Sequence, residues 1–108
     1  LAKLYIKNLQ ECKDVTMIKI NKNLTYAFHQ FVIRVNKRDS LIKYLKKSGI
    51  DTMIHYPYML NELNFFPKGK NLINSKNLGK KILSLPISEE HTENEINYVS
   101  KKIIQFYN

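Results

Sequence analysis

Cysteine, glycine and long apolar runs are scarce in this chain of 108 residues, and each shortage excludes a class of protein. The only cysteine, Cys12, has no partner for an internal disulfide, so we expect a cytoplasmic protein. Three glycines, Gly49, Gly69 and Gly79, cannot supply a glycine-rich nucleotide-binding loop. Apolar runs such as 31–33 stop at three residues, far below the roughly 20 that span a bilayer. We therefore expect no membrane partner.

Residues that could bind a metal or perform catalysis are also sparse. His29, His55, His91 and Cys12 lie far apart and show no short ligand spacing, so we expect no metal site. Cys12 falls within a helical pattern, which favours a small packing residue over a nucleophile. No catalytic constellation therefore supports a small enzyme complete within this chain.

Acidic residues are half as frequent as basic ones, and the net charge is +9. Such a charge is typical of proteins that bind nucleic acid. However, sixteen of the basic residues are lysine and only Arg34 and Arg38 are arginine, the residue that bidentate phosphate and base contacts favour. We do not expect a nucleic-acid partner.

Hydrophobic periodicity predicts one α+β domain over residues 1–108. The expected elements are a helix over 1–12, strands over 14–20 and 26–35, a helix over 36–49, a short strand over 52–55, an irregular segment over 58–74, a helix over 75–83, an extended run over 83–87 and a terminal helix after Thr92. This order predicts a small antiparallel or mixed sheet of about three or four strands with helices packed on one face. Because the chain begins at Leu1 and not at methionine, we interpret it as processed, truncated or excised from something longer.

Capping residues mark several helix ends. Asn36 is the expected N-cap of the second helix, with Asp39 reaching back to the free backbone amides, and Ser75 is the expected N-cap of the third. Gly49 is expected just after the end of the second helix, where a left-handed residue is needed. Thr92 and Glu95 have the spacing of a capping box at the start of the last helix.

One cluster, His55-Tyr56-Pro57, stands out as a candidate site. It follows a predicted strand and precedes an aromatic loop, a position that often lines binding sites. The alternative is structural: His55 could cap the strand end while Tyr56 packs. His29 lies within the predicted strand 26–35, on the face of Phe31, and the residues alone favour a hydrogen-bonded structural histidine.

Several segments together resemble a known family. These segments are Phe28 to Val35, Arg38 to Leu41, Gly49 to Pro57, and Leu83-Ser84-Leu85-Pro86-Ile87, followed by the capped terminal helix. In this order and spacing they resemble the C-terminal end of the DegT/DnrJ nucleotide-sugar aminotransferases, which are fold-type I enzymes that use pyridoxal phosphate (PLP). The resemblance covers essentially the whole chain.

The resemblance implies a function for a longer enzyme. Such enzymes transfer an amino group, usually from glutamate, to a keto group of a nucleotide-linked deoxysugar, and they act as homodimers. The resemblance also implies that PLP and the catalytic residues belong to an N-terminal domain outside this chain. We therefore expect a C-terminal small domain that binds no PLP and is inactive alone. The alternative is a stand-alone binding or interaction module.

The resemblance assigns sugar contacts to His55 and Tyr56 and a supporting role to His29. It also has departures. Phe28 stands where the family usually has tyrosine, and Met59 and Asn61 stand where it often has a second proline and a histidine. Phe28 lacks a hydroxyl group that tyrosine would supply. Met59 and Asn61 fall in the loop beside the expected sugar contacts, so the substrate can differ from that of the family's other members.

Overall fold

A computed structural model describes residues 1–21, 23–65 and 72–108. Its elements are α1 (Ala2–Leu9), β1 (Val15–Met17), β2 (Phe31–Val35), α2 (Arg38–Lys47), the 3-10 turn η1 (Leu60–Glu62), α3 (Ile73–Gly79), β3 (Ile82–Leu85) and α4 (Glu93–Tyr107). Within the segment expected to be irregular, residues 66–71 lie outside the described part. No described helix has the length and apolar character needed to cross a membrane.

The strands form one antiparallel sheet in the order β1-β2-β3. Ile33, at the centre of β2, pairs with Met17 on one side and with Leu83 on the other. Because side chains alternate along a strand, this register gathers the apolar side chains on one face. The α+β class and the antiparallel sheet are confirmed. The strand expected over 52–55 is reduced to a single bridge between Met53 and Ser84.

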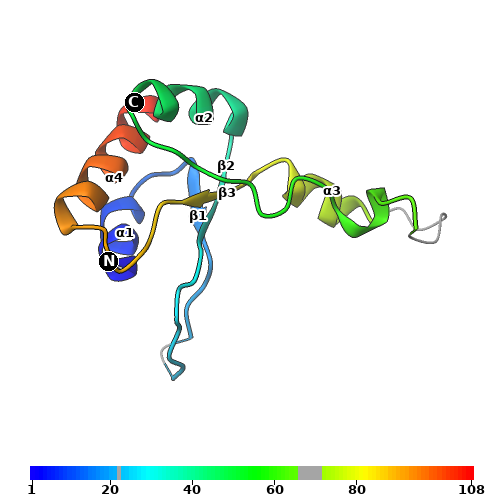
Figure 1. Cartoon of the computed structure of the whole chain (residues 1–108), viewed down its shortest axis with the longest axis horizontal. Helices are drawn as coiled ribbons and strands as arrows, with labels where there is room; N and C mark the ends of the chain where they lie inside the picture. The colour runs from blue at the N-terminus through cyan, green and yellow to red at the C-terminus, as the bar shows by residue number, and fades with distance from the viewer. Residues whose placement is uncertain (22, 66–71) are drawn as a thin grey trace.

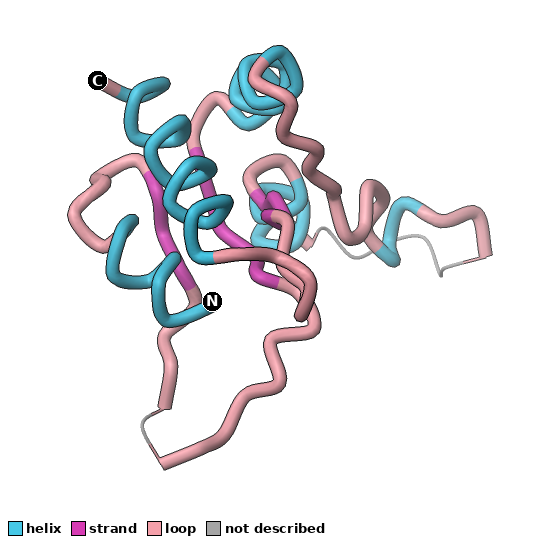
Figure 2. Tube along the Cα trace, turned by 60° about the vertical axis from the view of Figure 1, so that its left-hand side comes forward, coloured by secondary structure: helices cyan, strands magenta, loops and turns pink. Residues whose placement is uncertain are grey.

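Three helices complete a core on the apolar face of the sheet. α1 and α4 lie side by side, and α2 packs against α4, whereas α3 lies beyond the opposite side of the strands and buries no side chain (Figures 1 and 2). The core holds Tyr5, Leu9, Phe31, Ile33, Val35, Leu41, Leu45, Leu83, Leu85, Ile96, Val99 and Ile103. Three helices therefore cover one face, as the sequence predicts, and α3 does not.

Tyr5 joins α1 to the sheet. Its ring stacks on Phe31, with centroids 4.8 Å apart, and its hydroxyl donates a hydrogen bond of 2.8 Å to the carbonyl of Pro86. Burial raises the pKa of Tyr5, because the charged phenolate would lose its hydration. This buried, hydrogen-bonded phenol fixes the end of β3.

The second predicted strand is too long at its start. β2 begins at Phe31, not at Tyr26, and Phe28 has a φ of 49°, in the left-handed region that ends extended structure. β1 already ends at Met17, opposite Ile33, so the segment before Phe31 has no β1 partner. The pairing between β1 and β2 therefore does not extend into the segment before Phe31.

The predicted caps had mixed outcomes. The capping box is confirmed, since Glu95 accepts a hydrogen bond of 2.7 Å from the Thr92 amide and Thr92 accepts one from the Glu95 amide. Asn36 is not the cap of α2, because its side-chain Nδ2 donates to Oδ1 of Asp14. Lys37, with a φ of 51°, precedes the helix without a side-chain cap bond.

The predictions for the remaining helix ends are also partly confirmed and partly wrong. Gly49 follows α2 with a φ of 75°, as predicted, and the Ile50 amide donates to the carbonyl of Leu45. Ser75 lies inside α3 instead of capping it, because α3 begins at Ile73. Leu83 belongs to β3 and not to that helix, because the backbone of β2 pairs with it.

Candidate functional site

A hollow of about 510 Å³ opens where the chain leaves its bridge to β3. We call it the His55 hollow; its lining residues are His55, Tyr56, Pro57, Tyr58, Met59, Leu60, Leu63 and Ile82. Two of the three predicted site residues, His55 and Tyr56, are thus brought together. Aromatic and aliphatic side chains dominate the wall, and His55 is its one ionisable group besides the tyrosines.

Backbone pairing places His55 in this hollow. The Met53 amide donates to the Ser84 carbonyl at 3.2 Å, and the Ser84 amide donates to the Met53 carbonyl at 2.8 Å. The pairing goes no further, and Pro57, which has no amide hydrogen to donate, follows soon after. His55 therefore lies two residues beyond Met53, whose backbone is bound to Ser84 of β3. The opposite face of β3 packs into the core.

Ser84 hydrogen-bonds to the imidazole ring of His55. Nδ1 of His55 lies 2.9 Å from Oγ of Ser84, which is 6% exposed, while His55 itself is half-buried. The ring of Tyr56 stands edge-on to that of His55, with centroids 5.8 Å apart, and the peptide bond between the two residues is cis. The site thus pairs an oriented imidazole with an aromatic ring.

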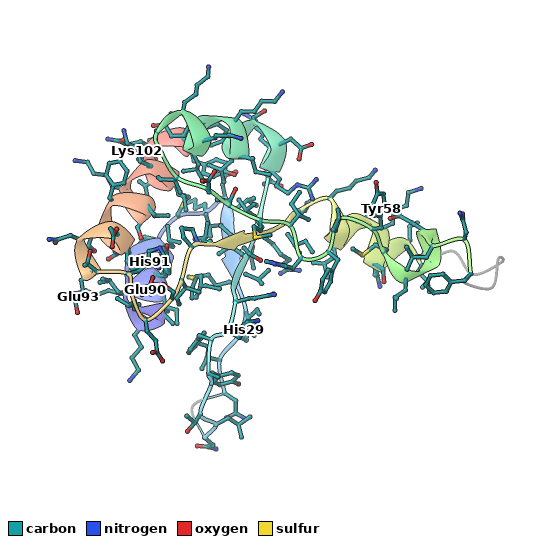
Figure 3. All side chains as sticks on the ribbon, in the orientation of Figure 1. His29, Tyr58, Glu90, His91, Glu93 and Lys102 are labelled. Atoms are coloured by element: carbon teal, nitrogen blue, oxygen red, sulfur yellow. The ribbon has the colours of Figure 1, made fainter. Side chains whose placement is uncertain are left out.

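The aromatic rim of the hollow is exposed. Tyr56 is 71% exposed and Tyr58 is 69% exposed, and Leu60 beside them is also open to solvent. Figure 3 shows Tyr58 on the arm that carries α3, away from the helices of the core. Exposed aromatic side chains on a loop can stack on or pack against a ligand or a partner.

His29 lies elsewhere. It is exposed, in the bend before β2, and does not lie in a strand on the core face as expected, because β2 begins only at Phe31. It lines two other hollows, one beside Phe28 and Met17 and one beside His91. Figure 3 shows His29 well apart from Tyr58. Within this chain the structure does not bring His29 to the His55 hollow.

Sequence reasoning missed the part played by Ser84. The alternation Leu83-Ser84-Leu85 puts this polar residue on the face opposite the core, and that parity was the available signal. A second serine–histidine pair was also missed: Ser88 Oγ lies 2.7 Å from Nδ1 of His91. Across the described residues, no three His, Cys, Asp or Glu side chains are grouped to hold a metal.

A family model for the DegT/DnrJ/EryC1/StrS aminotransferases matches residues 1–104. The chain belongs to this family. Among its relatives is a protein of Geobacillus stearothermophilus named pleiotropic regulatory protein, 40% identical over 86 residues, a match covering 76% of this chain and 23% of that protein. The dTDP-3-amino-3,6-dideoxy-alpha-D-galactopyranose transaminase of Aneurinibacillus thermoaerophilus is 22% identical over 98% of this chain and 30% of its own length.

Solved structures of this aminotransferase family share the fold. A DegT/DnrJ/EryC1/StrS aminotransferase from Brucella abortus superposes with a TM-score of 0.88 at 26% identity, over 99% of this chain and 29% of that chain. The S. venezuelae protein DesV, solved in complex with a ketimine intermediate, gives a TM-score of 0.90 at 22% identity, over 99% and 30% of the two chains. The chain thus spans less than a third of the length of the relatives that it matches.

Proposed function

We propose that this chain is the C-terminal small domain of a PLP-dependent sugar aminotransferase, which transfers an amino group, usually from glutamate, to the keto group of a nucleotide-linked deoxysugar. The family match over residues 1–104 is the observation that carries this proposal. Two relatives named as transaminases of dTDP-amino sugars support the substrate class. We further propose that the complete enzyme is a cytoplasmic homodimer.

The described residues of this chain do not fit the cofactor. PLP needs a lysine in a buried, desolvated setting for its Schiff base. Every described lysine is exposed apart from Lys102, which is half-buried and has its Nζ 5.6 Å from the centre of the Tyr98 ring. We therefore assign the cofactor to the part of the enzyme that this chain does not span, and we expect the chain alone to be inactive.

The small domain would contribute to sugar binding. An imidazole nitrogen of His55 can hydrogen-bond a sugar oxygen, and the exposed ring of Tyr56 offers an apolar face and a hydroxyl. His29, on a separate hollow of this chain, would have a supporting role. In this proposal the domain orients the sugar, and the chemistry takes place on the cofactor domain.

Enzyme kinetics on the full-length gene product test this function. We expect PLP-dependent amino transfer from glutamate to a dTDP-keto-deoxysugar, and no transfer by the 108-residue chain. Tyr56→Ala should raise the KM for the sugar severalfold without harming folding, since Tyr56 is largely exposed. His55→Ala should lower kcat/KM by about tenfold or more, the usual cost of leaving a polar partner unsatisfied.

A matched variant controls for general damage. Tyr98→Ala removes another exposed tyrosine, which lies outside the His55 hollow and outside the hollows that His29 lines. This control should keep the KM for the sugar. Equal effects of the test and control variants, or a full-length protein without amino transfer, would contradict the proposal.

An interaction module is the second candidate. The protein of Geobacillus stearothermophilus that is 40% identical over 86 residues carries a regulatory name, and the described loops expose several large apolar side chains. A full-length product that neither binds PLP nor transfers amino groups, yet retains an acidic partner with steep salt dependence, would favour this candidate.

A further inference from the structure

Ser84 and His55 are 29 positions apart in the chain, and the structure joins them at 2.9 Å. Ser84 is nearly inaccessible, with its backbone paired on both sides, to Val32 of β2 and to Met53. The hydroxyl is therefore a fixed group. Because His55 follows Met53 by only two residues, both ends of the hydrogen bond depend on the same bridge.

Counting hydrogen-bond partners favours one direction for this hydrogen bond. A buried hydroxyl that does not donate its proton leaves a polar group unsatisfied, at a real cost. Within the described part of the chain, Ser84 Oγ has no hydrogen-bond partner other than His55. This count favours donation by the hydroxyl of Ser84 to Nδ1 of His55.

An Nδ1 that accepts must be unprotonated, so the proton of the neutral ring is on Nε2. No other described residue bonds to the ring of His55. Nε2–H is thus left as a donor for a ligand in the hollow that His55 lines. A donor suits a hydroxyl or carbonyl oxygen and not another N–H group.

We infer that Ser84 is a positioning residue, which fixes the orientation of His55 and holds its Nε2–H tautomer so that His55 offers a hydrogen-bond donor to an oxygen of the substrate. The ligand part of this inference rests on the proposed sugar aminotransferase function. The positioning part depends only on the geometry of this chain. Ser84 makes no contact with the substrate in this role and acts through His55 alone.

Nitrogen NMR of the 108-residue chain tests the positioning. Long-range ¹H–¹⁵N spectra distinguish the two tautomers of each histidine. The spectra are recorded about two pH units above the ordinary pKa of histidine, where the ring is neutral. We expect the Nε2–H form of His55 to dominate. Ser84→Ala should reduce the ratio of the Nε2–H to the Nδ1–H form by about fivefold, the worth of one ordinary hydrogen bond. Ser84→Thr, which keeps the hydroxyl, should restore it.

Two serines elsewhere serve as controls. Ser88→Ala removes the partner of His91 and should change His91 while leaving His55 as it was. Ser100→Ala removes another buried hydroxyl, bonded to the Ile96 carbonyl within α4, and should change neither histidine. A purely structural effect of losing a buried serine would appear with Ser100→Ala as well.

Kinetics of the full-length enzyme separate the two parts of the inference. Ser84→Ala should raise the KM for the keto sugar by about fivefold and leave the KM for glutamate unchanged, with recovery in Ser84→Thr. An unchanged tautomer ratio in Ser84→Ala would overturn the positioning role, whatever the kinetics show. A shifted ratio combined with an unchanged sugar KM in His55→Gln would overturn the ligand contact and the proposed role of the hollow.

Discussion

The helical body of the molecule and its two arms have opposite characters. The body, formed by the sheet with α1, α2 and α4, contains the buried apolar core. The hairpin arm (residues 18–21 and 23–30) and the α3 arm (56–65 and 72–80) project from it (Figure 1) and expose apolar side chains, such as Phe65 at 81%. We therefore expect the body to supply most of the stability of this chain, whereas the arms present exposed apolar surface.

Two isoleucines give the sharpest test of this contrast. Ile33 in the body is 0% exposed and Ile18 on the hairpin arm is 67% exposed. We expect Ile33→Ala to lower the free energy of unfolding by about 3 kcal/mol, through lost burial and a cavity. Ile18→Ala should stay within about 0.5 kcal/mol. Urea unfolding measures both, and similar losses would remove the distinction between body and arms.

The cap of α4 should matter less than the core. Thr92→Ala should cost about 1 kcal/mol, because the Glu95 amide loses its side-chain acceptor. Ser75→Ala in the α3 arm, where the sequence predicts a cap and the structure has none, should cost under about 0.5 kcal/mol. Denaturant unfolding of both variants checks this. Equal losses in the free energy of unfolding would indicate that Ser75 does cap α3.

The same cap has a pH dependence of known sign. Hydrogen bonds from the backbone and then the side chain of Thr92 lower the pKa of Glu95. A carboxyl whose folded pKa is lowered stabilises the fold above its unfolded pKa and loses that contribution as the pH falls through the folded value. We expect acidification below about pH 5 to destabilise the wild type more than Thr92→Ala. Parallel pH profiles would contradict this coupling.

Tyr107 gives a small effect at the alkaline end. Burial, followed by the nearby Asp14 and Cys12, raises the pKa of Tyr107 to about 12, and its hydroxyl donates to the Asn36 carbonyl. Because its folded pKa is raised, Tyr107 contributes stability that is fully present below its unfolded pKa of about 10. This contribution is lost as the pH rises towards 12. Tyr107→Phe should therefore show a flatter decline of stability over this range, and an unchanged slope would refute the assignment.

The arms should have their effect on association and not on stability. Exposed apolar side chains on both arms favour self-association of the isolated chain. Replacing Leu24 and Phe65 with serine should reduce light scattering at high concentration and leave the unfolding midpoint unchanged. A clean monomer of the unmodified chain at high concentration would contradict this expectation.

Some local signals were readable from the sequence, although the caps expected at Asn36 and Ser75 were wrong. The Thr92–Glu95 box and the turn at Gly49 depend on residues a few positions apart, and both are confirmed. The start of β2 depends on where β1 ends, so the predicted strand over 26–35 ran too far.

The candidate site shows the same division. His55 and Tyr56 are adjacent in sequence and share a hollow, as a short motif can indicate. His29 is not in that hollow, and Ser84 reaches His55 across 29 positions, a contact that only the bridge to Met53 creates. The composition of the site therefore depends on pairing between distant segments, which the sequence alone did not predict.

The coding DNA upstream of the Leu1 codon tests the central claim most directly. If this chain is the small domain of a sugar aminotransferase, the open reading frame should continue upstream and encode a cofactor domain with a Ser-x-x-Lys segment for PLP. A start codon directly before Leu1, with no cofactor domain encoded, would contradict the claim and make this chain a free-standing module.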